Sequence, residues 1–346
     1  MKILHVLMTD KFSGAEKVAI DLIKNAKSNE YEFCYFSKKG SIEEILIENS
    51  ITYELCEKIS IKEIKKVIRK YKPDIIHCHD FTATILTCCC GENIPIISHI
   101  HQNPTWIQKK GFKSILYKFF QKKIDLVISV SPSFFKEYVY TNYIKQKLVL
   151  SNIIDLSNLK YKYNHDSDKC YDLLFLGRLA EVKDPLKCLE IFKRIQKNNP
   201  KINLAFVGDG ELKQECLNFV RINKLENNVK FFGFCKDISC YLNQSKILIN
   251  TSKWEGFGLS VVEGMSYGLP VVCNNVGGLI NLVDSECGLL CTNDSDFIEE
   301  INKLLFDKNY YDKKSKNAYN KSKGFENVKE YTNKVFQIYN ILLEEN

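Results

Sequence analysis

Residues 255–263 read Glu-Gly-Phe-Gly-Leu-Ser-Val-Val-Glu and lie between two apolar runs, 246–250 and 271–273. This order predicts a strand, a glycine loop, a helix and a second strand, with backbone amides at the helix start available to an anion. We expect Ser260 to cap that helix, and Ser260-x-x-Glu263 also fits a capping box, so Glu263 has a structural as well as a functional interpretation. Glu255 precedes the glycines, where a carboxylate can accept hydrogen bonds from vicinal hydroxyls.

The alternation of short apolar runs with amphipathic segments extends in both directions from this stretch. Runs 3–7, 33–36, 74–77, 95–98 and 125–130 form a first series, and runs 172–177, 204–208, 229–233 and 246–250 form a second. Buried parallel strands that open into polar loops have this appearance. We therefore predict an α/β protein of two Rossmann-like, doubly wound parallel-sheet domains, with the linker at 161–169, domains at 1–165 and 166–327, and a C-terminal helix in 328–346.

Length and composition agree with two domains. The chain has 346 residues, of which 45% are apolar, enough for two cores. The apolar run at the start is too short for a secretory signal, and no run reaches membrane-spanning length. We expect the 14 cysteines to be reduced core residues, and the absence of a Cys-x-x-Cys motif argues against structural zinc.

Charge is unevenly distributed along the chain. Residues 1–165 have a net charge of +8 and residues 166–346 a net charge of −1. The basic half suggests an anionic surface or substrate, although ordinary lysine-rich helix faces would give the same balance. Residues 106–123 hold six lysines among aromatic residues and no acid. They could form a membrane-surface helix or a lysine-decorated helix whose aromatic side chains face the core.

A second polar constellation follows the apolar run 172–177. Arg178 and Lys183 lie in the strand-to-helix loop that ends at Pro185, where a guanidinium and an ammonium suit a diphosphate. A solvated salt-bridge role is the alternative for this basic pair. Two Asp-x-Asp sequences, 166–168 and 294–296, are interpreted as turns and helix caps, so we expect no metal site.

Four of the six histidines fall in two short clusters at predicted strand ends, His77-Cys78-His79 and His99-Ile100-His101. Metal binding is one interpretation, but no Cys/His quartet with known spacing lies nearby, which favours substrate contact or packing. His101, followed by Gln-Asn-Pro, is the histidine that we expect to reach a binding cleft.

Together these motifs resemble the family-4 retaining glycosyltransferases of GT-B architecture, also described as group 1 glycosyltransferases of bacterial surface polysaccharide synthesis. The resemblance rests on Glu255 and Glu263 with Gly-Phe-Gly between them, on Gly177-Arg178 with Lys183, on the turn 207–210, and on the first-domain glycine and histidines. It spans essentially the whole chain. It implies two domains that face a central cleft and a C-terminal helix that crosses back to the first domain.

The resemblance also implies a role for each matching residue. Arg178 and Lys183 would contact the donor diphosphate, Glu255 the donor sugar, and Glu263 the ribose, while His101 would lie beside the reacting sugar. The other implied donor-site residues are Gly14, Gly177, Gly208, Gly210, Phe234, Gly256, Phe257, Gly258 and Leu259. Gly14 departs from the family pattern, because Ser13 stands where a second glycine is common.

From these features we expect a metal-independent, retaining hexosyltransferase without a cofactor. It would move a sugar from a nucleotide diphosphate sugar, with UDP favoured, to a glycan or lipid-linked acceptor. The basic first domain suggests a cytoplasmic enzyme with peripheral contact at the inner face of the cell membrane, and nucleic-acid binding is not expected. A GT-B nucleotide-sugar epimerase and a non-catalytic nucleotide-sugar-binding protein are the alternatives, and acceptor-dependent release of nucleoside diphosphate distinguishes all three.

Overall fold

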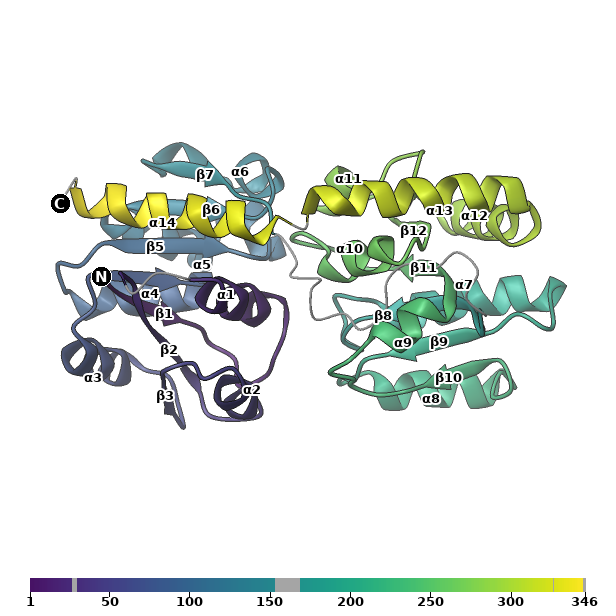
Figure 1. The fold of residues 1–346 in the computed structure, drawn as a ribbon, viewed down its shortest axis with the longest axis horizontal. Helices are drawn as coiled ribbons and strands as arrows, with labels where there is room; N and C mark the ends of the chain where they lie inside the picture. The colour runs from purple at the N-terminus through teal and green to yellow at the C-terminus, as the bar shows by residue number, and fades with distance from the viewer. Residues whose placement is uncertain (27–29, 153–168, 326, 345–346) are drawn as a thin grey trace. The chain divides into compact units, whose positions relative to one another are not determined.

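The computed structural model describes residues 1–26, 30–152, 169–325 and 327–344. The chain divides into two compact units, one formed by residues 1–153 with 327–346 and the other by residues 154–326. Residues 161–168 of the predicted linker 161–169, and with them the predicted boundary at 165, lie outside the described residues. Figure 1 labels the helices and strands of both units.

The N-terminal unit is built on a sheet of seven strands in the order β3-β2-β1-β4-β5-β6-β7, and every neighbouring pair is parallel. Its strands are β1 (Lys2–Val6), β2 (Glu32–Lys38), β3 (Tyr53–Cys56), β4 (Ile75–Cys78), β5 (Ile96–Ile100), β6 (Leu126–Ser129) and β7 (Lys147–Val149). Its helices are α1 (Gly14–Lys24), α2 (Ile42–Glu48), α3 (Ile61–Tyr71), α4 (Phe81–Cys90), α5 (Phe112–Phe120), α6 (Ser133–Glu137) and α14 (Val328–Glu344).

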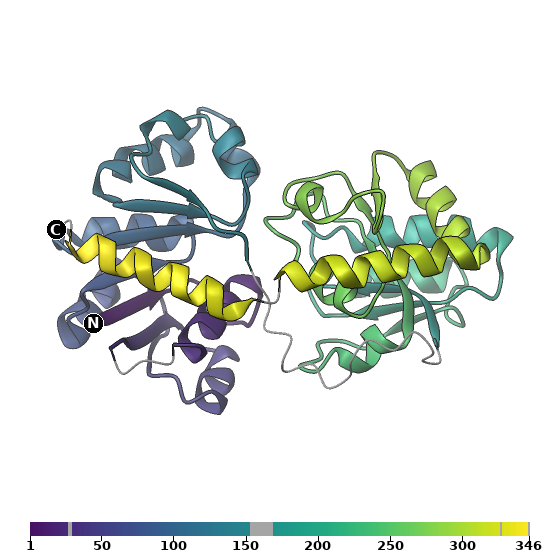
Figure 2. The ribbon, with the colours of Figure 1, turned by 45° about the horizontal axis from the view of Figure 1, so that its top comes forward.

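Helix α14, the last of the chain, packs on this N-terminal sheet. Tyr331, Val335, Tyr339 and Leu342 are buried in one cluster with side chains of α1, β1, β4, β5 and β6. Figure 2 shows the helix lying along the sheet of this unit. The contact places a C-terminal helix over the first strands of the chain, and it buries the apolar face that the helical spacing in 328–343 predicts.

The C-terminal unit has a six-stranded sheet in the order β10-β9-β8-β11-β12-β13, again with all pairs parallel. Its strands are β8 (Tyr171–Leu176), β9 (Leu204–Val207), β10 (Val229–Phe231), β11 (Ser245–Asn250), β12 (Val271–Asn274) and β13 (Gly288–Cys291). Its helices are α7 (Pro185–Asn198), α8 (Lys213–Ile222), α9 (Ser239–Asn243), α10 (Leu259–Ser266), α11 (Leu279–Leu282), α12 (Asp294–Phe306) and α13 (Lys308–Ser322).

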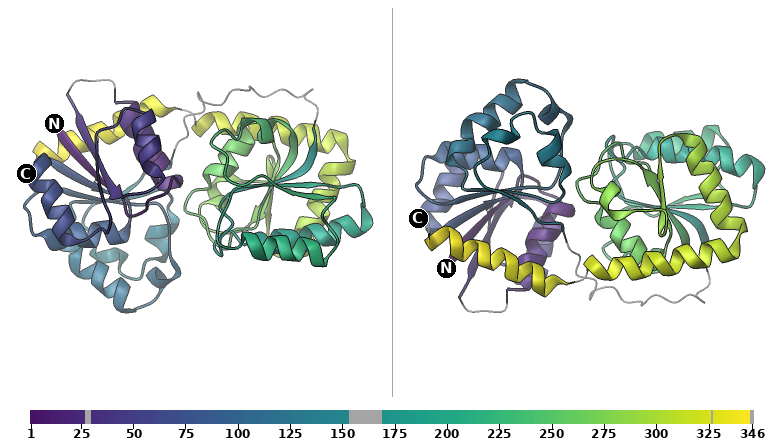
Figure 3. Two further views of the ribbon diagram at one scale, coloured as in Figure 1. Left: turned by 90° about the horizontal axis from the view of Figure 1, so that it is seen from below. Right: turned by 90° about the horizontal axis from the view of Figure 1, so that it is seen from above.

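The end-on views in Figure 3 show helices on both faces of each sheet. In both units the strand order turns back at one point, between β1 and β4 and between β8 and β11. Loops that follow the two strands at such a switch point diverge and open a crevice at the carboxyl edge of the sheet. The predicted doubly wound, parallel α/β architecture is confirmed for both units.

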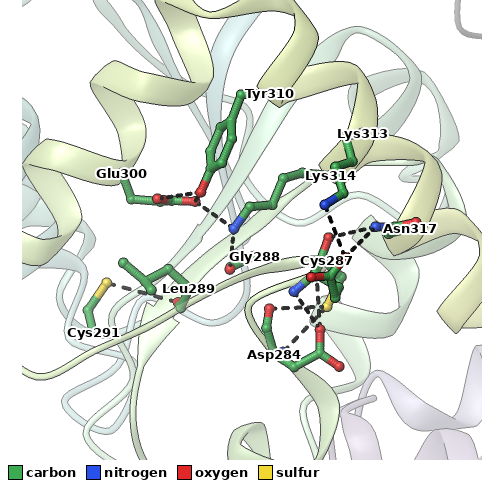
Figure 4. Close-up of polar contacts among 11 residues, drawn as sticks. Asp284, Cys287, Gly288, Leu289, Cys291, Glu300, Tyr310, Lys313, Lys314 and Asn317 are labelled. Carbon is green, nitrogen blue, oxygen red and sulfur yellow. Dashed lines mark hydrogen bonds and ion pairs between the residues drawn. The ribbon is translucent and has the colours of Figure 1, made fainter.

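A buried ion pair fixes helix α13 to the C-terminal sheet. Lys314 Nζ lies 3.0 Å from Glu300 Oε1 and donates to the carbonyl oxygen of Gly288 at 2.8 Å, and the Tyr310 hydroxyl donates to the same carboxylate (Figure 4). Burial alone lowers the pKa of Lys314, but Tyr310 and Glu300 together raise it above its usual value. Both charged side chains are therefore satisfied inside the protein.

All 14 cysteines are unpaired. Most of them are buried or half-buried, as predicted, but Cys170 and Cys240 are exposed, so the core interpretation is wrong for these two. Within the described residues, no helix combines the length and the apolar character that a membrane crossing requires.

Candidate active site

The loops after β8 and β9 touch through their backbones. Gly208 has a φ of +140°, and a Cβ atom there would lie 2.0 Å from the carbonyl oxygen of Gly177. At Gly210, a Cβ atom would lie 2.4 Å from the carbonyl oxygen of Leu179. Both positions therefore require glycine, and the close approach fixes the start of the loop that carries Arg178 and Lys183.

The side chains of Arg178 and Lys183, both in this loop, have different environments. Arg178 is exposed, and within the described residues its guanidinium has no hydrogen-bond or ion-pair partner. Lys183 instead forms an ion pair with Glu255 across the switch point, between the loops that follow β8 and β11. The structure thus brings together two residues that are 72 positions apart and that the sequence placed in one site.

Glu255 is held by several donors. Its Oε1 atom accepts from Ser252 Oγ at 2.8 Å and from Asn250 Nδ2 at 3.3 Å, in addition to Lys183. The side chain is only 8% exposed, against 24% for Lys183. A carboxylate with one charged and two neutral donors keeps a fixed orientation, and its Oε2 atom is not engaged by these three groups.

Two further glycines support the backbone of the Glu255 loop. A Cβ atom at Gly277 would lie 2.1 Å from the carbonyl oxygen of Glu255, and one at Gly278 would lie 2.2 Å from that of Gly256. Gly278 also donates its amide to the Glu255 carbonyl at 2.8 Å. The sequence analysis did not include this pair, although consecutive glycines after a predicted strand are a readable signal of close backbone approach.

The start of helix α10 differs from the prediction. The N-cap is Gly258, with φ +104°, and the helix begins at Leu259, so Ser260 lies inside the first turn and its side chain caps nothing. A Cβ atom at Gly258 would lie 2.7 Å from Leu279 Cδ2, which explains why glycine stands there. The capping-box interpretation of Glu263 is therefore wrong, and Glu263 projects from the second turn of the helix, half-buried.

The remaining donor-site residues of this unit have mixed surroundings. Phe257 is buried and packs edge-on against Phe325, with ring centroids 5.7 Å apart, so its side chain anchors the 255–258 loop rather than facing a ligand. Phe234, after β10, is 58% exposed and presents its ring to solvent. The Asp-x-Asp sequence at 294–296 begins helix α12, where Asp296 and Asn293 form a capping box, as predicted. The sequence at 166–168 lies outside the described residues.

In the N-terminal unit, Gly14 is the first residue of α1 and is exposed. Next to it, Ser13 donates its hydroxyl to the buried carboxylate of Glu16, and burial raises the pKa of Glu16 to about 6. A buried carboxyl group with a raised pKa in the first turn of a helix is a candidate functional group. Ser13-x-x-Glu16 has the same spacing as Ser260-x-x-Glu263, so the sequence carried a signal for this residue.

The histidine clusters meet each other on one face of the N-terminal sheet. His77 and His79 face His99 and His101, and His5 of β1, which the sequence analysis missed, completes the group. Nitrogen pairs lie 2.8 Å apart for His5 and His79 and 3.0 Å apart for His79 and His101. Burial lowers the pKa of all five, to about 3 for His5 and His101. His101 is buried, with only 9% of its surface exposed to solvent.

Comparison with known proteins identifies the family. Residues 159–321 match the sequence profile of the glycosyl transferases group 1, and residues 12–157 match that of glycosyltransferase family 4. The chain belongs to the family-4 glycosyltransferases. The parallel-sheet fold of both units and the ordered motifs of the sequence agree with this assignment.

Individual relatives of this glycosyltransferase are distant. An uncharacterized glycosyltransferase of Methanocaldococcus jannaschii is 29% identical, and the match covers 61% of this chain and 57% of that protein. The UDP-Gal:alpha-D-GlcNAc-diphosphoundecaprenol alpha-1,3-galactosyltransferase of Escherichia coli is 26% identical over 98% of this chain and 96% of its own length. The crystal structure of Anabaena HepE in complex with UDP and glucose superposes with a TM-score of 0.84 at 20% identity, covering 98% and 99% of the two chains.

Proposed function

We propose that this glycosyltransferase moves a sugar from a UDP-sugar to a hydroxyl of a glycan or lipid-linked acceptor, with retention of anomeric configuration and without a metal ion at the donor. The observation that carries the proposal is the contact between Lys183 and Glu255 across the β8/β11 switch point. A cation for the diphosphate and a fixed carboxylate for the sugar lie side by side where a nucleotide is expected in this fold. The UDP and UDP-Gal in the names of the relatives support uridine as the base.

Each donor-site residue has a physical task in this proposal. The exposed guanidinium of Arg178 and the ammonium of Lys183 bind the diphosphate oxygens, and the first-turn amides of α10 after Gly258 add N–H donors. Glu255 accepts from sugar hydroxyls, and Glu263 from the ribose. Phe234 offers an exposed ring to the base at the edge formed by Gly208 and Gly210.

Two positive groups and a helix N-terminus can stabilise the diphosphate as it leaves, which is the reason that we propose no metal there. The carboxylate nearest to the proposed sugar, Glu255, already accepts three hydrogen bonds at Oε1 and serves to orient rather than to attack. Retention then follows if the acceptor hydroxyl approaches on the face that the diphosphate leaves, and a diphosphate oxygen takes the acceptor proton. Gly14 and His101 keep their predicted places near the donor and the reacting sugar as part of this proposal.

The test begins with calorimetric titration of the full chain with UDP, GDP and ADP. Selective binding of UDP that is lost in Arg178→Ala and Glu263→Ala supports the donor site. Lys313→Ala is the matched control, because Lys313 of helix α13 forms an exposed ion pair with Glu286 and lies outside the segments 177–185 and 255–263. Absence of binding to every nucleoside diphosphate, or equal loss in the control, contradicts the proposal.

Turnover tests the remaining parts of the proposal. Acceptor-dependent release of UDP, undiminished by a chelator, with a product anomer that matches the donor in NMR spectra, is the expected result. A requirement for added Mg²⁺ or Mn²⁺ would contradict metal independence, and an inverted anomer would contradict retention.

The N-terminal unit also offers a face for an anionic membrane, where lipid-linked acceptors reside. On helix α5, Phe112 and Phe119 are 80% and 72% exposed, and Ile115 lies between them at the helical spacing of one face. The lysines around this face are Lys109, Lys110, Lys113, Lys122 and Lys123, all exposed. Exposed apolar side chains surrounded by lysines suit peripheral binding to the inner leaflet, as we propose, while Tyr117 and Phe120 of the same helix face the core.

Vesicle flotation tests the membrane face. The full chain should float with vesicles that contain anionic lipid and much less with neutral vesicles, and Phe112→Ser with Phe119→Ser should abolish flotation. Phe306→Ser, at an equally exposed phenylalanine of the C-terminal unit, is the control and should float as the wild type does. Equal flotation of all variants would exclude this face.

A further inference from the structure

Outside the donor loops, the densest set of metal-ligating side chains is the imidazole cluster of His5, His77, His79, His99 and His101. The side chains share one face because they alternate along β1, β4 and β5, which are neighbours in the sheet, and because His5 is in register with His77. The five rings stack or tilt against one another with centroid separations that begin at 4.1 Å. The predicted function uses only His101 and leaves the other four unexplained.

The spacing of the ring nitrogens suits a metal ion. Two sets of three, His5 with His77 and His79, and His79 with His99 and His101, each offer one nitrogen per residue within 4.8 Å of the others. In a tetrahedral zinc site, metal–nitrogen bonds of ~2.0–2.1 Å put neighbouring nitrogens about 3.3 Å apart. The His79–His101 pair, at 3.0 Å, already has nearly this separation, and His99 offers a nitrogen within 4.8 Å of the other two ligand atoms.

Buried ring nitrogens without a hydrogen-bond partner within the described residues occur in both sets: His5 Nε2 in the first, and His99 Nε2 and His101 Nδ1 in the second. Leaving a buried polar atom unpaired costs about 1–3 kcal/mol, so these atoms call for an explanation. A metal ion on His99 Nε2 would satisfy one of the three. His101 is also the most exposed of the five, which gives the second set a route to solvent.

We propose that His79, His99 and His101 bind a divalent transition-metal ion of the zinc type. His79 would bind through Nδ1 and His99 and His101 through Nε2. The other ring nitrogens then have outer contacts of the kind that orient metal-ligating histidines: His79 Nε2 lies 2.8 Å from His5 Nδ1, and His99 Nδ1 lies 3.2 Å from His77 Nε2. His77 then donates a hydrogen bond from Nδ1–H to the Tyr339 hydroxyl oxygen at 2.7 Å, so all five rings remain neutral.

The chemistry of the site selects the ion. All three ligands are imidazoles, and no carboxylate within the described residues contacts them, so Zn²⁺, Ni²⁺ or Cu²⁺ is preferred over Mg²⁺ or Ca²⁺. Three protein ligands leave a fourth position for water. This ion belongs to the N-terminal unit and is independent of the donor diphosphate, so the inference does not rest on the proposed function.

The experiment uses the full chain, purified without a polyhistidine tag, stripped with a chelator and titrated with Zn²⁺ and Co²⁺. Cys170→Ser and Cys240→Ser remove the two exposed thiols, which could bind metal on their own. We expect one equivalent of tight binding, a tetrahedral Co²⁺ spectrum, and a metal-dependent rise in the unfolding temperature that Trp106 of the N-terminal unit reports.

Variants connect the binding to the triad. His79→Gln, His99→Gln and His101→Gln should each weaken binding at least 100-fold, whereas Tyr339→Phe, which alters an outer contact, should weaken it about 10-fold. His165→Gln, the same substitution at the sixth histidine of the chain, should leave binding unchanged. Absence of stoichiometric binding to the native wild type, equal binding to the urea-unfolded chain, or an undiminished affinity in the triad variants would overturn the proposal. The wild-type titration decides the question even if a triad variant fails to fold.

Discussion

Replacing Lys183 by methionine should destabilise the C-terminal unit more than replacing Glu255 by glutamine. The methionine removes the charged partner of a carboxylate that is only 8% exposed and leaves it with Ser252 and Asn250 as neutral donors. Breaking a fully buried pair costs about 3–5 kcal/mol. Because Lys183 is a quarter exposed and two hydrogen bonds remain, we expect about 2–3 kcal/mol.

The reverse change leaves a milder defect. In Glu255→Gln the amide still accepts from Ser252, and the freed ammonium of Lys183 can turn toward water, so about 1 kcal/mol should be lost. The double variant should cost little more than Glu255→Gln alone, which gives a coupling energy of about 2–3 kcal/mol. The asymmetry between the two single variants identifies the carboxylate as the group that depends on the pair.

The assay follows from the placement of the two tryptophans, one in each unit. In a Trp106→Phe background, Trp254 alone reports urea unfolding of the unit that contains the site. Lys313→Met is the control, because its ion pair with Glu286 is exposed on both sides and should contribute at most about 0.5 kcal/mol. A loss in Lys183→Met no larger than that of the control would refute the buried pair. The same variant should weaken UDP binding about 10- to 150-fold if Lys183 also binds the diphosphate.

Three further outcomes are expected. Lys314→Met should lower the free energy of unfolding by about 3–5 kcal/mol in the Trp254 urea assay, because Glu300 stays buried with Tyr310 as its remaining donor. Lys313→Met should lower it only slightly, and equal losses in the two variants would contradict this prediction. The pKa of Glu16 is raised from 4.5 to about 6, so the folded protein binds this proton more tightly than the unfolded chain does. The free energy of unfolding should therefore fall by about 2 kcal/mol as pH rises from 4.5 through 6. Glu16→Gln should lack this decline, and parallel pH curves for the variant and the wild type would contradict the prediction. Gly208→Ala should lose UDP binding and about 2 kcal/mol or more of stability, whereas Gly111→Ala, with no atom within 4 Å of the new methyl group, should change neither.

The sequence predicted the strands of the switch point well, because each is a short apolar run that ends at glycine or polar residues. The β8 run, 172–177, and the β11 run, 246–250, match the observed strands to within one residue at each end. The start of α10 was misplaced by two residues, because Ser260 fits the usual cap chemistry and the left-handed backbone of Gly258 depends on its contact with Leu279. Local pattern could not show that tertiary contact.

Strand order was the other information that the sequence lacked. His5 stands alone in the first apolar run, and only the adjacency of β1, β4 and β5 shows that it belongs with the four paired histidines. For the same reason the sequence alone does not reveal the Lys183–Glu255 contact. Strands β8 and β11 are neighbours in the sheet, although two strands separate them in the chain. The motifs name the residues that we propose for the site, but the partner of each side chain comes from the topology.

The two sheets have the same strand order around their switch points, yet the polar groups there differ in charge, and this difference bears on the proposed mechanism. Within the described residues, none of the five imidazoles of the N-terminal unit has a carboxylate partner, and His79 and His101 bond only to other rings. A histidine that acts as a general base normally has an acidic partner that stabilises the imidazolium it becomes. His101 lacks that partner, so the proposed mechanism does not use it to take the proton of the acceptor. In the proposed mechanism Arg178 and Lys183 of the C-terminal unit hold the diphosphate, and a diphosphate oxygen accepts the proton of the acceptor hydroxyl.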